Sequence, residues 1–143
     1  MKRLILIIFL TIFLTGCNSL ALINPSANTA TTTTNTSTKN YDDFSDLMIT
    51  NADEQLTQNY SVYYLYYFQE ACYACNQIKN EVLSKIELLE NDKIYLIDVH
   101  GVDDICESIN VTHTPSIVKI VDHQVEYIKE GSTDVLEVLN SLS

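Results

Sequence analysis

An uncharged run of aromatic and β-branched residues, from Ser61 to Phe68, leads into two closely spaced cysteines in the segment Cys72-Tyr73-Ala74-Cys75. Such a run, bounded by polar residues, is typical of a strand that is buried on both faces. Residues 72–90 then predict a helix, because apolar side chains recur along one face and charged side chains lie elsewhere. The sequence therefore predicts a buried strand followed by a helix that opens with both cysteines.

The position of the two cysteines determines their chemistry. A thiol at a helix N-terminus lies near unsatisfied N–H groups and the positive end of the helix dipole, and both favour thiolate over thiol. The thiolate is the nucleophile in disulfide exchange. Cys75 follows one turn further into the helix, where it can attack a mixed disulfide formed on Cys72. We therefore expect Cys72 to attack and Cys75 to resolve.

The remaining elements predict an α/β fold. The last two strands are joined by a tight turn at Asp122-His123, and Gly131 breaks the chain before a helix that Ser132 or Thr133 can cap. A strand–helix–strand unit followed by a hairpin and a closing helix predicts a mixed sheet with helices on both faces. We expect one helix that begins near residue 41, two at 72–90 and 103–109, and a last one after residue 131. The expected strands are 61–68, 94–99, 116–121 and 124–129.

The N-terminus predicts secretion and a lipid anchor. Two basic residues precede an uncharged apolar run at 4–15, which is the pattern of a secretory signal, here residues 1–16. Leu14-Thr15-Gly16-Cys17 resembles the lipobox of bacterial lipoproteins, a resemblance that implies lipidation of Cys17 as the first mature residue. Residues 17–40 are rich in Thr and Asn and read as a flexible tether, so the folded domain is expected at 41–143.

The charge excludes one class of function. The chain has 8 Lys and Arg against 19 Asp and Glu. Removal of the signal leaves six basic side chains, none of them arginine, and a net charge of −13. Such a surface repels nucleic acid, so no nucleic-acid partner is expected.

Three features together resemble the thioredoxin superfamily. The first is the strand, the cysteine pair and the helix; the second is Thr114-Pro115, 40 residues after Cys75 and just before the hairpin; the third is Gly131 after the last strand. The resemblance implies the thioredoxin-like fold, a central mixed four-stranded sheet with helices on both faces. It also implies that Pro115 is a cis-proline facing the cysteines and that the backbone at Thr114 binds the substrate chain.

The sequence departs from this family at several positions. Ala71 stands where the family usually has Trp, Tyr73-Ala74 where Gly-Pro is common, and Tyr66 where thioredoxins have a buried acid. Glu70 and His113 are candidate modulators of the thiolate, against an alternative in which both are solvated loop residues. These departures leave the direction of electron flow open.

Other interpretations of the cysteines also stand. Cys72 and Cys75 could form a structural disulfide, or half of a zinc site completed by Cys106, His100 or His113, although we expect no metal. Cys106 itself is most simply a buried core residue, with a third redox thiol as the alternative. The missing family residues also allow a non-catalytic binding lipoprotein with the same fold, serving secretion or assembly.

The resemblance implies an enzyme that exchanges thiols and disulfides with protein substrates. The only redox group that it requires is its own disulfide, so no cofactor is expected. We expect a monomer, lipid-anchored on the extracytoplasmic face of the cell membrane, with an electron donor or acceptor in that membrane as a further partner.

Overall fold

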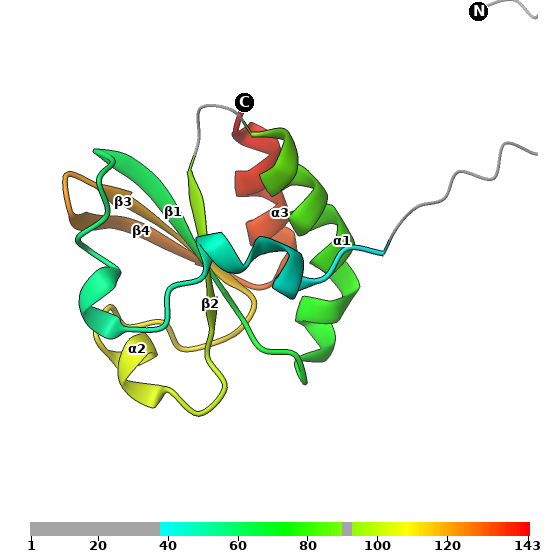
Figure 1. Cartoon of the computed structure of the whole chain (residues 1–143), viewed down its shortest axis with the longest axis horizontal. Helices are drawn as coiled ribbons and strands as arrows, with labels where there is room; N and C mark the ends of the chain where they lie inside the picture. Colours follow the sequence, from blue (N-terminus) through cyan, green and yellow to red (C-terminus); the bar gives the residue numbers. More distant parts are fainter. Residues whose placement is uncertain (1–37, 90–92) are drawn as a thin grey trace, which may run out of the picture. The chain divides into compact units, whose positions relative to one another are not determined.

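The aromatic run forms the central strand of the fold, β1 (Val62–Phe68). The computed structural model describes residues 38–89 and 93–143, coloured by sequence in Figure 1. The predicted signal peptide (1–16), Cys17 and the predicted tether up to residue 37 lie outside the described residues. Within the described ranges, no helix is long and apolar enough to cross a membrane.

Four strands form one mixed sheet in the order β2-β1-β3-β4. Strand β1 pairs in parallel with β2 (Ile94–Asp98) and antiparallel with β3 (Ser116–Val121), and β3 pairs antiparallel with β4 (Gln124–Glu130). The predicted mixed four-stranded sheet is confirmed. The β3–β4 turn has Asp122 and His123 at φ 47° and 65°, as a two-residue hairpin turn of this twist requires.

The side chains of β1 alternate between two cores. Tyr64, Tyr66 and Phe68 pack in the core that contains residues of α1 (Tyr73–Leu88) and α3 (Ser132–Ser141). On the opposite face, Tyr63, Leu65 and Tyr67 pack in the core that contains residues of the short helix α2 (Asp103–Glu107). Figure 1 shows α1 and α3 side by side on one face of the sheet. The prediction of helices on both faces is confirmed.

The predicted first helix is instead two short 3-10 helices, η1 (Tyr41–Leu47) and η2 (Ala52–Glu54). Between them, Met48 bridges to Leu96, and the Ile49 amide donates to the Leu96 carbonyl at 2.8 Å. Tyr41 belongs to the α1 core and Ile49 to the α2 core. The segment therefore crosses the edge of the sheet, which a single continuous helix could not do.

The predicted cap of the last helix is wrong. Gly131 is the N-cap of α3, at φ 93°, and no side chain makes the capping hydrogen bond. The hydroxyl of Ser132 instead donates to the carbonyl oxygen of Ala74 at 3.2 Å. This bond joins the start of α3 to the first turn of α1, so the serine connects the two helices and does not cap α3.

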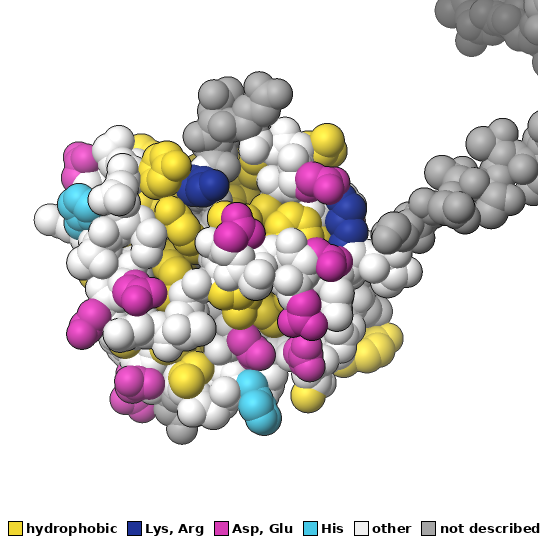
Figure 2. Space-filling view, in the orientation of Figure 1, with side chains coloured by type: hydrophobic (Ala, Val, Ile, Leu, Met, Phe, Trp, Pro, Cys, Tyr) yellow, Lys and Arg dark blue, Asp and Glu magenta, His cyan; other side chains and the backbone are white. Residues whose placement is uncertain are grey.

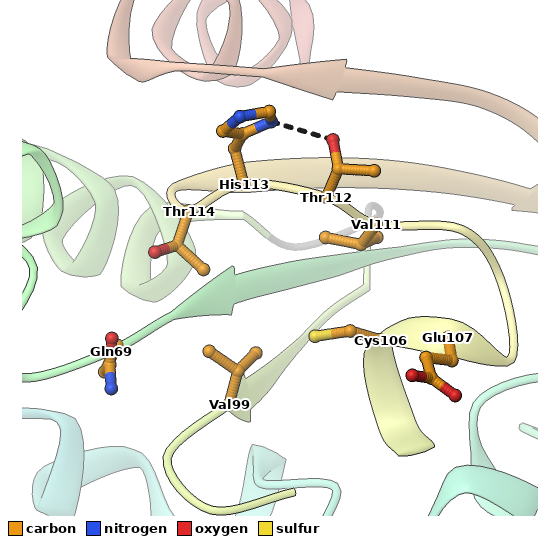
Figure 3. A pocket seen from close by; sticks show the side chains of 8 residues that line it. All are labelled: Gln69, Val99, Cys106, Glu107, Val111, Thr112, His113 and Thr114. Carbon is orange, nitrogen blue, oxygen red and sulfur yellow. Dashed lines mark hydrogen bonds between the residues drawn. The ribbon is translucent and has the colours of Figure 1, made fainter. Parts of the chain in front are cut away.

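A pocket of about 380 Å³ lies between α2 and the loop that precedes β3 (Figure 3). Cys106 lines it together with Val99, Val111 and Thr114, and its sulfur points toward Val99. The thiol is partly exposed and packs against the edge of the α2 core, so the expectation of a buried core residue is corrected.

Figure 2 shows acidic side chains spread over the visible face, as the net charge predicts.

Candidate functional site

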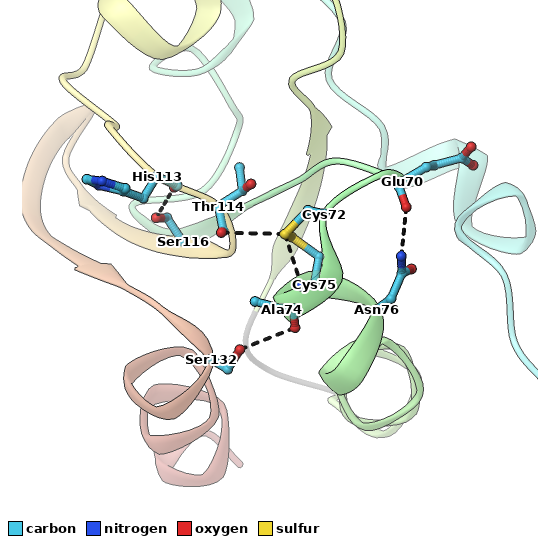
Figure 4. Close-up of a disulfide and its surroundings, with 9 residues drawn as sticks. All are labelled: Glu70, Cys72, Ala74, Cys75, Asn76, His113, Thr114, Ser116 and Ser132. Atoms are coloured by element: carbon cyan, nitrogen blue, oxygen red, sulfur yellow. Dashed lines mark hydrogen bonds between the residues drawn. A yellow bond between two sulfur atoms is a disulfide. The ribbon is translucent and has the colours of Figure 1, made fainter.

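Cys72 and Cys75 are joined by a disulfide, with their Cα atoms 5.3 Å apart (Figure 4). Cys72 is the N-cap of α1 and is partly exposed, whereas Cys75 is fully buried in the first turn. An incoming thiolate can therefore reach the Cys72 sulfur but not its neighbour. The pair is thus asymmetric, with one sulfur accessible and the other shielded.

The backbone of α1 contacts the outer sulfur. The Cys75 amide donates to Cys72 Sγ at 3.1 Å, in the place where a capping side chain normally accepts from a free helix N–H group. In the reduced protein the same amide can donate to a thiolate, with which the helix dipole also interacts favourably. The position of Cys72 thus favours the ionised sulfur that exchange requires.

Asn76 holds the loop before the cysteines and was missed by the sequence analysis. Its side-chain amide donates to the Glu70 carbonyl at 2.7 Å, while its backbone amide donates to the Cys72 carbonyl at 3.1 Å. The Cys72 amide closes a turn by donating to the Gln69 carbonyl at 3.0 Å. These bonds fix the backbone on the N-terminal side of the disulfide.

The bond between Thr114 and Pro115 is cis, and this loop lies against the disulfide. The Thr114 carbonyl oxygen is 3.5 Å from Cys72 Sγ. In the disulfide this sulfur carries no hydrogen, so the approach is a contact; the reduced thiol can donate to the same oxygen. Two segments that are 42 residues apart thus meet at the sulfur that is accessible.

Glu130, at the end of β4, holds the other end of this loop and was also missed. Its Oε1 atom accepts from the Thr112 amide at 2.8 Å and from the His113 amide at 3.1 Å. Partial burial raises the pKa of the Glu130 carboxyl, but the hydrogen bonds from Thr112 and His113 outweigh it and leave this pKa below its usual range. In the sequence, an acid beside a glycine gave no sign of this role.

The two predicted modulators lie near the site, but their side chains turn away from it. Figure 4 shows the Glu70 carboxylate and the His113 imidazole both pointing away from the sulfur atoms. The imidazole is 77% exposed and lies 3.5 Å from the Glu130 carboxylate, while Glu70 contributes only its carbonyl to the loop. Neither side chain is placed to contact Cys72 directly.

The structure also shows where the alternative zinc ligands lie. Across residues 38–89 and 93–143, no group of three or more His, Cys, Asp or Glu side chains is arranged to hold a metal ion. The sulfur atoms of Cys72 and Cys75 are bonded to each other, and His100 Nδ1 lies 3.3 Å from the side-chain amide of Gln69.

Comparison with known proteins gives the fold and the anchor. Residues 1–18 match the family model described as "Prokaryotic membrane lipoprotein lipid attachment site". No curated protein sequence matches the chain. Among solved structures, mitochondrial thioredoxin 3 from Saccharomyces cerevisiae is 20% identical, with a TM-score of 0.57 over 66% of this chain and 93% of that one. The thioredoxin of Fasciola hepatica is 17% identical, with a TM-score of 0.56 over 68% and 96%.

At these identities the structural likeness shows the fold alone. The chain has the thioredoxin fold, so the predicted resemblance is confirmed at that level. The match at residues 1–18 supports a lipid-anchored association with a membrane. Substrates and the direction of chemistry have to be argued from the site itself.

Proposed function

We propose that this protein is a thiol–disulfide oxidoreductase that acts on protein substrates, with Cys72 as nucleophile and Cys75 as resolving thiol. The observation that carries the proposal is the setting of Cys72 Sγ. It is partly exposed at a helix N-terminus, bonded to a buried partner, and 3.5 Å from the backbone of the Thr114–Pro115 loop. A structural disulfide requires neither the exposure nor the adjacent loop.

The site can transfer two electrons by successive exchange. In the reducing direction, the Cys72 thiolate attacks one sulfur of a protein disulfide, forms a mixed disulfide and releases the other sulfur as a thiolate. The Cys75 thiolate then attacks Cys72 Sγ, releases the second substrate thiolate and leaves the Cys72–Cys75 disulfide. The substrate gains two electrons and the two protons that the enzyme thiols lose. The oxidising direction runs these steps in reverse.

Thr114 and Pro115 supply the surface on which a captured chain would rest. Because the Thr114 carbonyl is adjacent to Cys72, a polypeptide attached to that sulfur has to run beside this backbone. The proposed partners are therefore protein thiols and disulfides. The disulfide is the only redox group that the proposal uses, and the proposed unit is a monomer.

The proposed location is the extracytoplasmic face of the cell membrane, with Cys17 carrying the lipid. The support is the lipid attachment site at residues 1–18. A donor or acceptor in the same membrane would return the pair to its starting redox state.

Insulin reduction with dithiothreitol as electron source tests the proposal. We expect Cys72→Ser to abolish catalysis, because the pair loses its exposed thiol and Cys75 is fully buried. Cys75→Ser should lose the intramolecular resolving step. Reduced, freed of dithiothreitol and then mixed with oxidised insulin, it should accumulate a mixed disulfide on Cys72, detected by mass spectrometry. Cys106→Ser is the matched control and should stay within about twofold of the wild type, because only the pair exchanges.

A wild-type protein that neither reduces insulin nor is oxidised by a protein disulfide would contradict the proposal. The non-catalytic binding lipoprotein would then be the better account. For an active protein, the reduction potential of the pair decides the direction. A value near about −270 mV indicates a reductant, and one near about −120 mV an oxidant.

A further inference from the structure

We infer that Glu130 is a positioning residue for substrate binding, because its carboxylate holds the loop at residues 111–115 so that the Thr114 backbone stays against Cys72. This inference rests on the proposed function, since it assigns a role within the same exchange reaction. Glu130 does not contact the sulfur atoms and acts through Thr112 and His113.

Several hydrogen bonds of the loop converge on the end of β4, in addition to the bond from the Ser116 hydroxyl to the His113 carbonyl at 2.6 Å. The Thr112 hydroxyl adds to the two amide bonds described above, lying 2.9 Å and 3.1 Å from the two oxygens of the Glu130 carboxylate. The next residue along the chain, Gly131, donates its amide to the Pro115 carbonyl at 2.8 Å. Side chain and backbone of adjacent residues thus hold the loop on both sides of Thr114.

The loop needs such support because it lies outside the sheet ladder. Residues 111–115 belong to no helix or strand, and both Thr112 and His113 are exposed. Amides at an exposed position can exchange a protein acceptor for water at little cost, and the loop then gains conformational freedom. A carboxylate that accepts two amides at once restrains that freedom, because charge-assisted hydrogen bonds are stronger than neutral ones.

The position of Thr114 matters for substrates that carry a polypeptide. A sulfur bonded to Cys72 lies about 2 Å from Sγ, so the chain that carries it runs close to the carbonyl oxygen found at 3.5 Å. A small disulfide has no backbone to place there. Loss of the Glu130 contacts should therefore weaken binding of protein substrates and leave the reactivity of Cys72 toward small disulfides unchanged.

The test compares Glu130→Ala with Glu130→Gln and with Glu126→Ala in the full chain without its signal. Glu126 lies on the same strand, but its carboxylate pairs with Lys119 at 2.8 Å, so its loss removes the same charge without touching the loop. Glutamine keeps one oxygen, and in the wild type a single oxygen accepts both amides. The readouts are KM and kcat for insulin reduction, and the rate constant with hydroxyethyl disulfide.

We expect Glu130→Ala to raise KM for insulin about tenfold while kcat and the hydroxyethyl disulfide rate stay within about twofold. Glu130→Gln should recover most of that KM, and Glu126→Ala should match the wild type. In hydrogen exchange followed by NMR, the Thr112 and His113 amides should lose protection only in Glu130→Ala.

An unchanged KM in Glu130→Ala, with the wild type active, overturns the positioning role and leaves the proposed function standing. The same holds if both substrates slow equally, because that pattern reports general destabilisation. A wild type that reduces neither substrate, while its Thr112 and His113 amides are protected, overturns the proposed function instead.

Discussion

The two faces of the sheet bury similar aromatic side chains, but the hydroxyl groups of these side chains differ in their hydrogen bonds. The α2 face is the one covered by α2, and the disulfide face is the one covered by α1 and α3, where Cys75 is buried. On the α2 face, Tyr63 donates to the Gln55 carbonyl at 2.6 Å, and Tyr67 donates to the side-chain oxygen of Gln55. On the disulfide face, the hydroxyls of Tyr41 and Tyr66 are buried near each other, and neither has another hydrogen-bond partner among the described residues. Burial raises the pKa of Tyr66, so this hydroxyl stays neutral.

On the α2 face, the buried side chain of Gln55 links several elements by hydrogen bonds. It is fully buried, and its amide group donates to the Ile105 carbonyl at 3.0 Å and to the Ser108 hydroxyl at 2.9 Å. One side chain therefore joins η2, β1 and α2. A satisfied buried network specifies a single arrangement. On the disulfide face, the hydrogen bonds from Ser132 to Ala74 and from Lys85 to the Leu142 carbonyl are only partly buried. We infer that the face opposite the disulfide contributes more of the polar stabilisation of the domain.

Gln55→Leu should have the largest effect on stability. The substitution keeps apolar volume but leaves the Tyr67 hydroxyl buried without its partner, while the Ile105 carbonyl keeps only its bond from the Ser108 hydroxyl. We expect a loss of about 2–4 kcal/mol in the free energy of unfolding, measured by urea denaturation. Gln58→Leu is the control, because the Gln58 amide bonds only the exposed carbonyl of Glu54. Equal losses of unfolding free energy in both variants would contradict the special role of the Gln55 network in the stability of the α2 face.

The neighbouring tyrosines Tyr66 and Tyr67 give a matched pair of smaller changes. Tyr67→Phe removes a hydrogen bond to Gln55 and should cost about 1–2 kcal/mol. Tyr66→Phe removes a buried hydroxyl whose only polar neighbour is the Tyr41 hydroxyl, and it should change the stability by less than about 1 kcal/mol. Urea denaturation of both variants measures the difference. A larger loss in Tyr66→Phe would show that its hydroxyl is satisfied in solution.

The smallest expected effect concerns pH. Because the folded state lowers the pKa of Glu130, this carboxyl contributes stability that is fully present above its unfolded pKa of about 4.3. The contribution is lost as the pH falls through the lower folded pKa. With a side chain 33% exposed, it amounts to less than about 1 kcal/mol.

Urea denaturation of the wild type and Glu130→Gln between pH 3 and pH 7 measures this term. The stability difference between the two proteins should be constant above about pH 5 and shrink toward pH 3. A difference that grows on acidification would reverse the sign of the proposed linkage.

The parts of the site that could be predicted from the sequence are those set by short, continuous segments of the chain. The strand before Cys72, the start of α1 and the proline at 115 are all written in short segments with their own patterns. Gln55 and Glu130 were missed because their partners lie far along the chain, 50 residues away for Ile105 and 18 for Thr112. The cap of α3 failed for the same reason, since the Ser132 hydroxyl bonds Ala74 on another helix.

The central claim is that Cys72, and not Cys75, is the accessible nucleophile at the start of α1. Competitive alkylation of the fully reduced protein with iodoacetamide at neutral pH, followed by peptide mass spectrometry, tests it directly. We predict that Cys72 is modified at least about tenfold faster than Cys75 or Cys106, because only Cys72 combines exposure with a helix N-terminus. Faster modification of Cys75, or equal rates at all three cysteines, would contradict this account.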